Sequence, residues 1–314
     1  MAAPSTLNVG SVEGLLLLAE WVPYLQIETS CYPEMFLGNV SAVKDNMAWS
    51  LIGQAVRHSY LLRLDKASFR ETSREEPQEL ENRKRLAWIC KFDKHRLISP
   101  ETLTCLVVVY IADRQISVRM GQSFWSRGPS LSTRFTANDF PSLGLGADAE
   151  HGYALVLQAS IELTQLLHNV HDILYSSKER RIQMVRRGDY SRYLDDFRCS
   201  LSAWQGCWDD LKTSPKLNCT LRIFKEYVRL YANAFSFQSL LSIAAHDNRV
   251  LEERTPTTSS EPDFSVSLFP QGIMSTAEGA YVLEAVTASR NILTIAGQTN
   301  AESHIRYMPF RFYV

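Results

Sequence analysis

Apolar residues recur with the period of an α-helix along most of this chain, and this pattern limits the fold more than any other feature of the sequence. It is clearest in residues 188–211, where apolar and half-apolar side chains follow one another at alternating steps of four and three. That spacing puts them on one stripe of a helix, with the charged residues largely elsewhere. The stripe consists of Tyr190, Leu194, Phe197, Leu201, Trp204, Trp208 and Leu211.

The same periodicity predicts helices in several other parts of the chain. Segment 41–64 begins at Ser41, a residue type that caps helix N-termini. Segments 148–176 and 216–246 are each about 30 residues long, and at 1.5 Å per residue such helices span about 45 Å. We therefore expect an all-α fold, a large multi-helix layered domain of about eight or nine helices. The remaining predicted helices are 11–22, 275–297 and 301–314.

One stretch has the composition of a strand, and two others have the composition of loops. The run from Leu106 to Ile111 is rich in β-branched residues, but it continues into Ala-Asp-Arg without a turn. We interpret it as the start of a buried helix. Prolines and glycines among serines and threonines predict loops at 121–146 and 247–271. No boundary is sharp enough to divide residues 1–314, so we treat them as one domain.

The charge balance and the cysteines exclude several classes of protein. Acidic residues number 34 and lysines plus arginines 33, so the surface as a whole has no excess of positive charge to bind nucleic acid. The six cysteines are far apart and form no Cys-x2-Cys pair, which argues against a zinc site in this chain. The leucine run 15–18 is too short to span a bilayer, and no secretory signal is visible. We therefore expect the cysteines to be reduced thiols in the cytosol or nucleus.

No motif typical of catalysis occurs in the sequence. It lacks a serine nucleophile elbow, a phosphate-binding loop, a dinucleotide-binding glycine motif and a His-Glu-x-x-His motif. His168 and His171 are three positions apart on a predicted helix, where two imidazoles can share a metal. Because no spacing supplies a third ligand, we favour two polar positions beside an apolar stripe. We expect no enzyme, no metal site and no cofactor in this chain.

Two further patterns allow two interpretations each. The basic run from Lys178 to Arg187 is either a nuclear-import or phosphate-contacting segment or an exposed connection between two helices. The aromatic residues of the later helices either line an effector pocket or form the core. We favour the second interpretation in both cases. The aromatic set is Trp204, Trp208, Phe224, Tyr227, Tyr231, Phe235 and Phe237.

The most distinctive stretch runs from Tyr110 to Ser132 and reads YIADRQISVRMGQSFWSRGPSLS. A short basic segment, Arg-Lys-Arg-Leu-Ala-Trp, precedes it at 83–88. Within the stretch Gly121 is placed to end a helix, with the cation of Arg119 beside the last carbonyls.

The charged residues of this stretch are either structural or ligand-binding. In the structural interpretation, Asp113 pairs with an arginine across two helices. In the other, the arginines hold a carboxylate bidentately. The candidate effector-binding residues are therefore Arg114, Arg119 and Trp125.

These stretches resemble the regulatory middle domain of fungal zinc-cluster transcription factors, and so do two earlier segments. Glu13 to Trp21 resembles the opening helix of one subgroup. Ser50 to Arg57, followed by Leu64 and Asp65, resembles the family's Trp-x-x-x-Gly-x-Ala-hydrophobic-Arg helix. The 110–132 stretch is most similar to regulators of aromatic amino-acid catabolism and of the weak-acid response.

The resemblance implies a nuclear activator or repressor that controls RNA polymerase II transcription of metabolic genes. Such a domain senses a small-molecule effector, for instance an amino acid, or contacts co-regulators and the transcription machinery. The full-length protein is expected to be a homodimer and to bind DNA through a zinc cluster. This sequence lacks that cluster, so zinc is expected only in the missing N-terminal domain. The alternative is a free-standing helical ligand- or protein-binding module without DNA-binding activity.

The chain departs from the family pattern in two further places. The family runs almost directly from Leu-Ala-Trp into Val-Tyr-Ile-Ala-Asp-Arg, whereas residues 89–106 intervene here without helical periodicity and include Pro100. We interpret 89–106 as a non-native insertion from a retained intron. The segment from Tyr307 to Phe312 resembles the start of a family helix that normally continues, so we expect the chain to be a fragment.

These two hypotheses predict a particular transcript. Full-length cDNA from the locus should splice out the codons for Ile89 to Leu106 and add an upstream six-cysteine cluster. Uniform read coverage across the codons for 89–106, with no upstream cysteine cluster in frame, would contradict both hypotheses.

Overall fold

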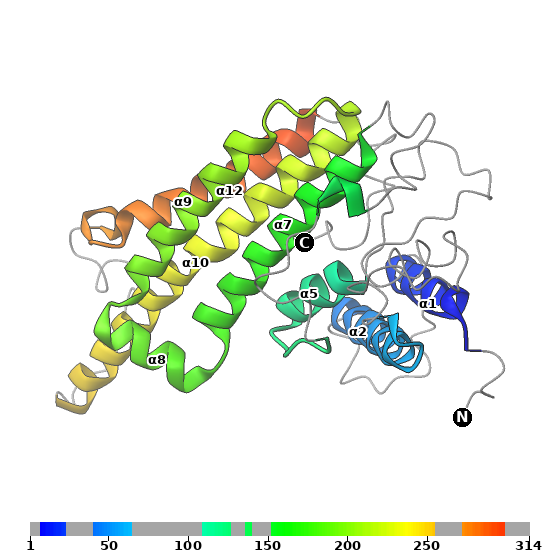
Figure 1. Ribbon diagram of the computed structural model, residues 1–314. Coiled ribbons are helices and arrows are strands. Elements are labelled where there is room, and N and C mark those ends of the chain that lie inside the picture. Colours follow the sequence, from blue (N-terminus) through cyan, green and yellow to red (C-terminus); the bar gives the residue numbers. More distant parts are fainter. Residues whose placement is uncertain are drawn as a thin grey trace. The chain divides into compact units, whose positions relative to one another are not determined.

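The structure, a computed structural model, describes residues 7–22, 40–64, 109–126, 136–139, 152–254 and 272–298. Every regular element in these ranges is helical, and eight of the elements are α-helices (Figure 1). The prediction of an all-α, multi-helix fold is confirmed. The α-helices are α1 (Val9–Trp21), α2 (Val40–Leu61), α5 (Val109–Met120), α7 (Tyr153–Val170), α8 (Lys178–Arg187), α9 (Tyr190–Trp208), α10 (Pro215–Arg254) and α12 (Gly279–Gln298).

Three short elements accompany these helices. A π-helical turn, η8 (His171–Tyr175), follows α7 directly, so the helix predicted over 148–176 is an α-helix that ends in a π-turn. The other two, η6 (Ala137–Asp139) and η9 (Ile273–Ser275), are 3-10 turns.

The chain forms two compact units. Unit 1 comprises residues 1–164, 211–218 and 300–314, and unit 2 comprises 165–210 and 219–299. This division cannot be read from the sequence, because two of the changes of unit fall inside helices α7 and α10, where the helical periodicity is uninterrupted.

Helix α1 of unit 1 begins at a capping box. The Asn8 side chain accepts a hydrogen bond from the Ser11 backbone N–H at 2.9 Å, and the Ser11 hydroxyl accepts one from the Asn8 N–H at 3.2 Å. This exchange satisfies donors that a helix start leaves without partners. Helix α1 packs against α2, which in turn packs against α5. The buried residues of α1 include Val12, Leu16 and Ala19.

Helix α5 is buried on every side from Val109 to Val118. A helix that is enclosed all round needs no amphipathic pattern. This explains why its first residues have the composition of a strand. The interpretation of 106–111 as the start of a buried helix is confirmed for Val109 to Ile111, while 106–108 lie outside the described residues.

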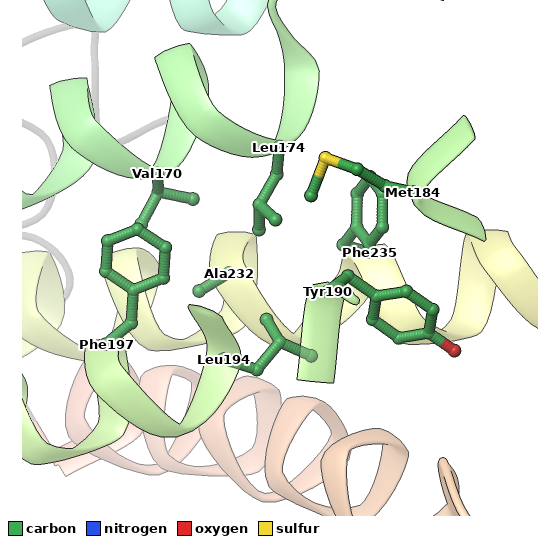
Figure 2. Packing of buried hydrophobic residues seen from close by; sticks show 8 residues of the cluster. All are labelled: Val170, Leu174, Met184, Tyr190, Leu194, Phe197, Ala232 and Phe235. Carbon is green, nitrogen blue, oxygen red and sulfur yellow. The ribbon is translucent and has the colours of Figure 1, made fainter. Parts of the chain in front are cut away.

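The core of unit 2 gathers apolar side chains from four helices. Figure 2 shows them converging from the end of α7 with its π-turn, from α8, from α9 and from α10. The stripe predicted on α9 faces this core, since its residues from Tyr190 to Leu201 are buried. Trp204 and Trp208 are half-buried, and Leu211 lies beyond the end of the helix. The core residues are Val170, Leu174, Met184, Tyr190, Leu194, Phe197, Ala232 and Phe235.

A charged network joins α10 to α12. The buried Glu226 carboxylate receives Lys225 Nζ at 2.8 Å and both Arg229 Nη1 and Asn291 Nδ2 at 3.1 Å. Arg229 also binds Glu284 on α12. Burial opposes the ionisation of Glu226, but hydrogen bonds from Lys225 and Asn291 and the charges of Lys225 and Arg229 outweigh it, so its pKa lies below the usual value. The carboxylate is therefore ionised and paired, as a buried charge must be.

Two segments predicted to be irregular are helical in the structure. Helix α10 continues to Arg254, into the range 247–271 predicted as a loop, because no proline or glycine lies between Pro215 and Pro256. The basic run predicted as a connection forms α8. Ser177 caps its start by accepting the Arg180 N–H at 3.1 Å, and Gly188 ends it with a φ of 71°.

Other predicted features lie outside the described residues. They are the helix at 301–314, the proposed insertion at 89–106 and most of the two predicted loops. No helix in the described part of the chain combines the length and apolar character needed to cross a bilayer.

Two phenylalanines on α10 provide a matched test of the unit 2 core. Phe235 is fully buried, whereas Phe237 is 40% exposed. We expect Phe235→Ala to lower the free energy of unfolding by about 3–5 kcal/mol because it leaves a cavity. Phe237→Ala should cost less than about 1 kcal/mol. Urea denaturation followed by circular dichroism measures both, and equal losses would contradict this core.

Candidate functional site on helices α2 and α5

The end of α5 has the geometry predicted from Gly121. This glycine has a φ of 62°, its N–H donates to the Val118 carbonyl at 3.1 Å, and the Gln122 N–H donates to the Ser117 carbonyl at 2.8 Å. These two bonds form a Schellman motif, which satisfies the last carbonyls of the helix. The predicted helix end at Gly121 is confirmed, and the chain turns back toward the helix after it.

Asp113 holds the returning chain against α5. Its carboxylate accepts hydrogen bonds from the Trp125 N–H at 3.0 Å, the Ser126 N–H at 2.9 Å and the Ser126 hydroxyl at 2.7 Å. It also accepts one from Arg114 Nη1 at 2.6 Å. The structural interpretation of Asp113 fits these contacts, but its arginine partner is the next residue of the same helix rather than a residue of another helix.

Arg114 is fully buried, and its guanidinium has several partners within unit 1. Besides Asp113, it donates to the Ser126 hydroxyl and to the Ser126 carbonyl at 2.9 Å. It lies over the rings of Tyr110 and Phe124, 4.5 and 4.6 Å from their centres. Burial raises the pKa of Tyr110 to about 12, so this phenol stays neutral. Arg114 therefore positions the 124–126 segment within the protein.

Arg119 points to a different neighbour. Its Nε donates to Asp45 Oδ2 on α2 at 3.1 Å, and both side chains are mostly buried. Five residues separate it from Arg114, which at 3.6 residues per turn places the two about 140° apart around α5. The two guanidiniums therefore do not converge on one ligand.

Trp125 packs on helix α2. Its ring lies 4.6 Å from that of Trp49 at an angle of 38°, and the Arg57 guanidinium lies 5.6 Å from its centre. Between these contacts Trp125 passes so close to Gly53 that a Cβ there would lie 2.9 Å from an indole carbon. Only glycine leaves room for this approach.

One face of α2 carries all of these contacts. Asp45, Trp49, Gly53 and Arg57 follow one another at steps of four, which aligns them along the helix. Together with Arg119 and Trp125 from α5 and its following segment, they form what we call the α2–α5 site. Of these six residues only Arg119 and Trp125 were predicted to be functional. The step-of-four spacing of the polar and aromatic residues on α2 is the signal that locates the others.

Two polar atoms of this site are buried without a hydrogen-bond partner. They are the indole Nε1 of Trp49, a donor, and Oδ1 of Asp45, an acceptor. Most buried polar atoms in proteins are hydrogen-bonded, so each exception calls for an explanation. Arg119 lies beside Asp45 and the Trp125 ring lies beside Trp49, a combination that suits a small polar or aromatic molecule with a donor and an acceptor.

The two histidines that we interpret as polar positions rather than as a metal pair, His168 and His171, have separate partners. His168 Nε2 lies 3.7 Å from Asp172 Oδ2, whereas His171 Nδ1 lies 2.8 Å from the Tyr231 hydroxyl. Burial lowers the pKa of His171. The described residues contain no group of three or more histidines, cysteines or acidic residues arranged to hold a metal.

The aromatic set of the later helices is mainly core. Phe224 and Phe235 are buried, and Tyr231 stacks on Tyr175 of the π-turn with ring centres 4.6 Å apart. Phe237 is the exposed member. These contacts agree with the interpretation of the set as core for the buried members.

No protein-family model matches the chain. No solved structure matches it at a significant level. A comparison with curated proteins shows similarity to a fungal transcription factor. This relative is the transcription factor hmgR of Aspergillus fumigatus, with 23% identity over an alignment of 353 positions that covers 99% of this chain and 42% of the relative. The chain thus spans less than half the length of that relative.

The close approach of Trp125 to Gly53 can be tested against a second helical glycine. Gly53→Ala should destabilise unit 1 by about 1–3 kcal/mol, because the new methyl group overlaps the indole. Gly14→Ala on α1, where nothing lies within 4 Å of the new Cβ, should instead stabilise the protein by about 0.5–1 kcal/mol. Thermal unfolding followed by tryptophan fluorescence measures both. Changes in melting temperature of the same sign in the two variants would contradict the packing described here.

Proposed function

We propose that this chain is the regulatory middle domain of a fungal zinc-cluster transcription factor that controls RNA polymerase II transcription of metabolic genes in the nucleus. The similarity to the transcription factor hmgR supports this proposal, because it extends over 99% of the chain rather than over one motif. The all-α fold agrees with it. The distinctive 110–132 stretch also supports it, since its described part forms a buried helix and a fixed turn.

The proposed activity is the sensing of a small-molecule effector, of which an amino acid is the leading example. Arg119 and Trp125 are the residues that we assign to binding, together with Asp45 and Trp49, whose buried polar atoms lack partners. Arg114 acts as a positioning residue, because its guanidinium holds the segment that carries Trp125.

The proposal also names partners outside this chain. Co-regulators or the transcription machinery would read the state of this domain. DNA would be bound by a separate zinc cluster, with zinc held there, and the full-length protein would be a homodimer. The name of the relative describes a transcription factor and offers no support for an enzyme.

A thermal-shift series with the whole chain tests the effector role. Aromatic amino acids at millimolar concentration should raise the melting temperature by several degrees, since selective binding to the folded state at 100 times Kd contributes about 2.7 kcal/mol. Arg119→Gln should abolish this ligand-induced rise, whatever its effect on the melting temperature without ligand.

The matched control is Arg222→Gln, which removes an exposed arginine from α10. This variant should keep the full ligand-induced rise. A rise of equal size in both variants would overturn the assignment of Arg119. The absence of any rise across the twenty amino acids would overturn the amino-acid effector.

A further inference from the structure

Helix α8 is a short, well-defined helix that presents one face to solvent. The Ser177 cap fixes its start, and at its end the Gly188 N–H donates to the Met184 carbonyl at 2.9 Å. Met184 is its buried residue and belongs to the core of unit 2 (Figure 2). The helix is therefore held in place along one side, and its orientation on unit 2 is set by the core.

The exposed face of α8 is strongly basic. Lys178, Arg180, Arg186 and Arg187 are all exposed, and Glu179 is the one acidic residue of the helix. Within the described part of the chain, none of these four cations forms an ion pair or a side-chain hydrogen bond.

Two other arginines of unit 2 are paired: Arg198 with Asp195 at 3.1 Å, and Arg229 with both Glu226 and Glu284. Arg222 on α10 and Arg290 on α12 are exposed like those of α8, but they occur singly. Helix α8 differs because it gathers four exposed cations within ten residues.

Helix stability does not explain the positions of these cations. Lys178 and Arg180 lie in the first turn, where the helix dipole is positive and a cation costs about 0.3–1 kcal/mol. Only Arg186 and Arg187, in the last turn, are favourably placed. Cations at the wrong end of a helix that is already capped point to an interaction with something outside the chain.

The distribution of charge favours a polymeric anion. At 3.6 residues per turn, the four cations cover an arc of about 200° around the helix, which is too wide for one small anion. The helix is about 15 Å long, and duplex DNA carries one negative charge per about 1.7 Å of its axis. Three of the four cations are arginines, whose planar guanidinium matches phosphate geometry. The whole chain has a net charge of −1, so the attraction is local to this helix.

We propose that the exposed face of α8 contacts the phosphate backbone of duplex DNA without reading its base sequence. This contact goes beyond the regulatory role proposed above. It gives this chain a sequence-independent affinity for DNA that does not depend on a zinc cluster.

Fluorescence anisotropy with the whole chain and two unrelated 25-base-pair duplexes, between 25 and 200 mM salt, tests the proposal. Both duplexes should bind with similar affinity. The triple variant Arg180→Gln, Arg186→Gln, Arg187→Gln should bind more weakly, and the slope of log K against log salt should fall in magnitude by about 2.7, or about 0.9 per lost phosphate contact.

Two control variants separate this contact from other causes. One combines Lys212→Gln, Arg222→Gln and Arg290→Gln, which removes the same charge from exposed positions outside α8 and should leave the slope unchanged. The other replaces the same three arginines of α8 with lysine, which keeps the charge of the helix and should retain most of the DNA binding. It can still be measured if the glutamine variant fails to fold.

Ile182, which is 41% exposed on α8, distinguishes DNA from an acidic protein partner. Ile182→Ser keeps every charge and should leave DNA binding unchanged. No binding at 25 mM salt would overturn the proposal, and so would an equal loss in the two charge-matched variants. Binding of an acidic peptide that depends on Ile182, without binding of DNA, would assign the face to a protein.

Discussion

The buried pair of Asp113 and Arg114 is the interaction on which the α2–α5 site depends. Two opposite charges in a protein interior stabilise it only when their remaining polar atoms are also satisfied. Ser126 meets most of this requirement: its N–H and hydroxyl donate to Asp113, while its hydroxyl and carbonyl accept from Arg114. The loss of either charge would strand the other in the core. The pair thus fixes the path of the chain that follows α5.

The path of this segment determines which residues α2 needs where Trp125 contacts it. Because Ser126 is fixed, Trp125 projects onto α2, where it needs a flat neighbour and an open space. Trp49 supplies the first and Gly53 the second. The site therefore depends on one buried charge pair. This pair holds residues 124–126, and through Trp125 they contact α2, a helix far away in the sequence.

The sequence predicts the helices of this protein well where their residues are amphipathic or their ends carry caps. The stripe of α9 and the end of α5 at Gly121 are of this kind, because their causes are local. Prediction from the sequence fails where tertiary contacts determine the feature. The partner of Asp113 is set by the fold of residues 124–126. Helix α8 is different, because its caps, Ser177 and Gly188, are local signals that the prediction of an exposed connection did not use. Two of the six residues of the site, Arg119 and Trp125, were predicted from the sequence, whereas Asp45 and Trp49 are recognised only from their contacts with these two.

The π-turn from His171 to Tyr175 has a consequence for how this fold tolerates changes of length. A π-turn closes its hydrogen bonds over one more residue than an α-turn, so the last turn of this helix holds one residue more than an α-helical turn would. Leu174 and Tyr175 lie in this turn, where Leu174 enters the core and Tyr175 stacks on Tyr231. An insertion or deletion within 171–175 would therefore change the directions of both side chains, although no proline or glycine marks the turn in the sequence.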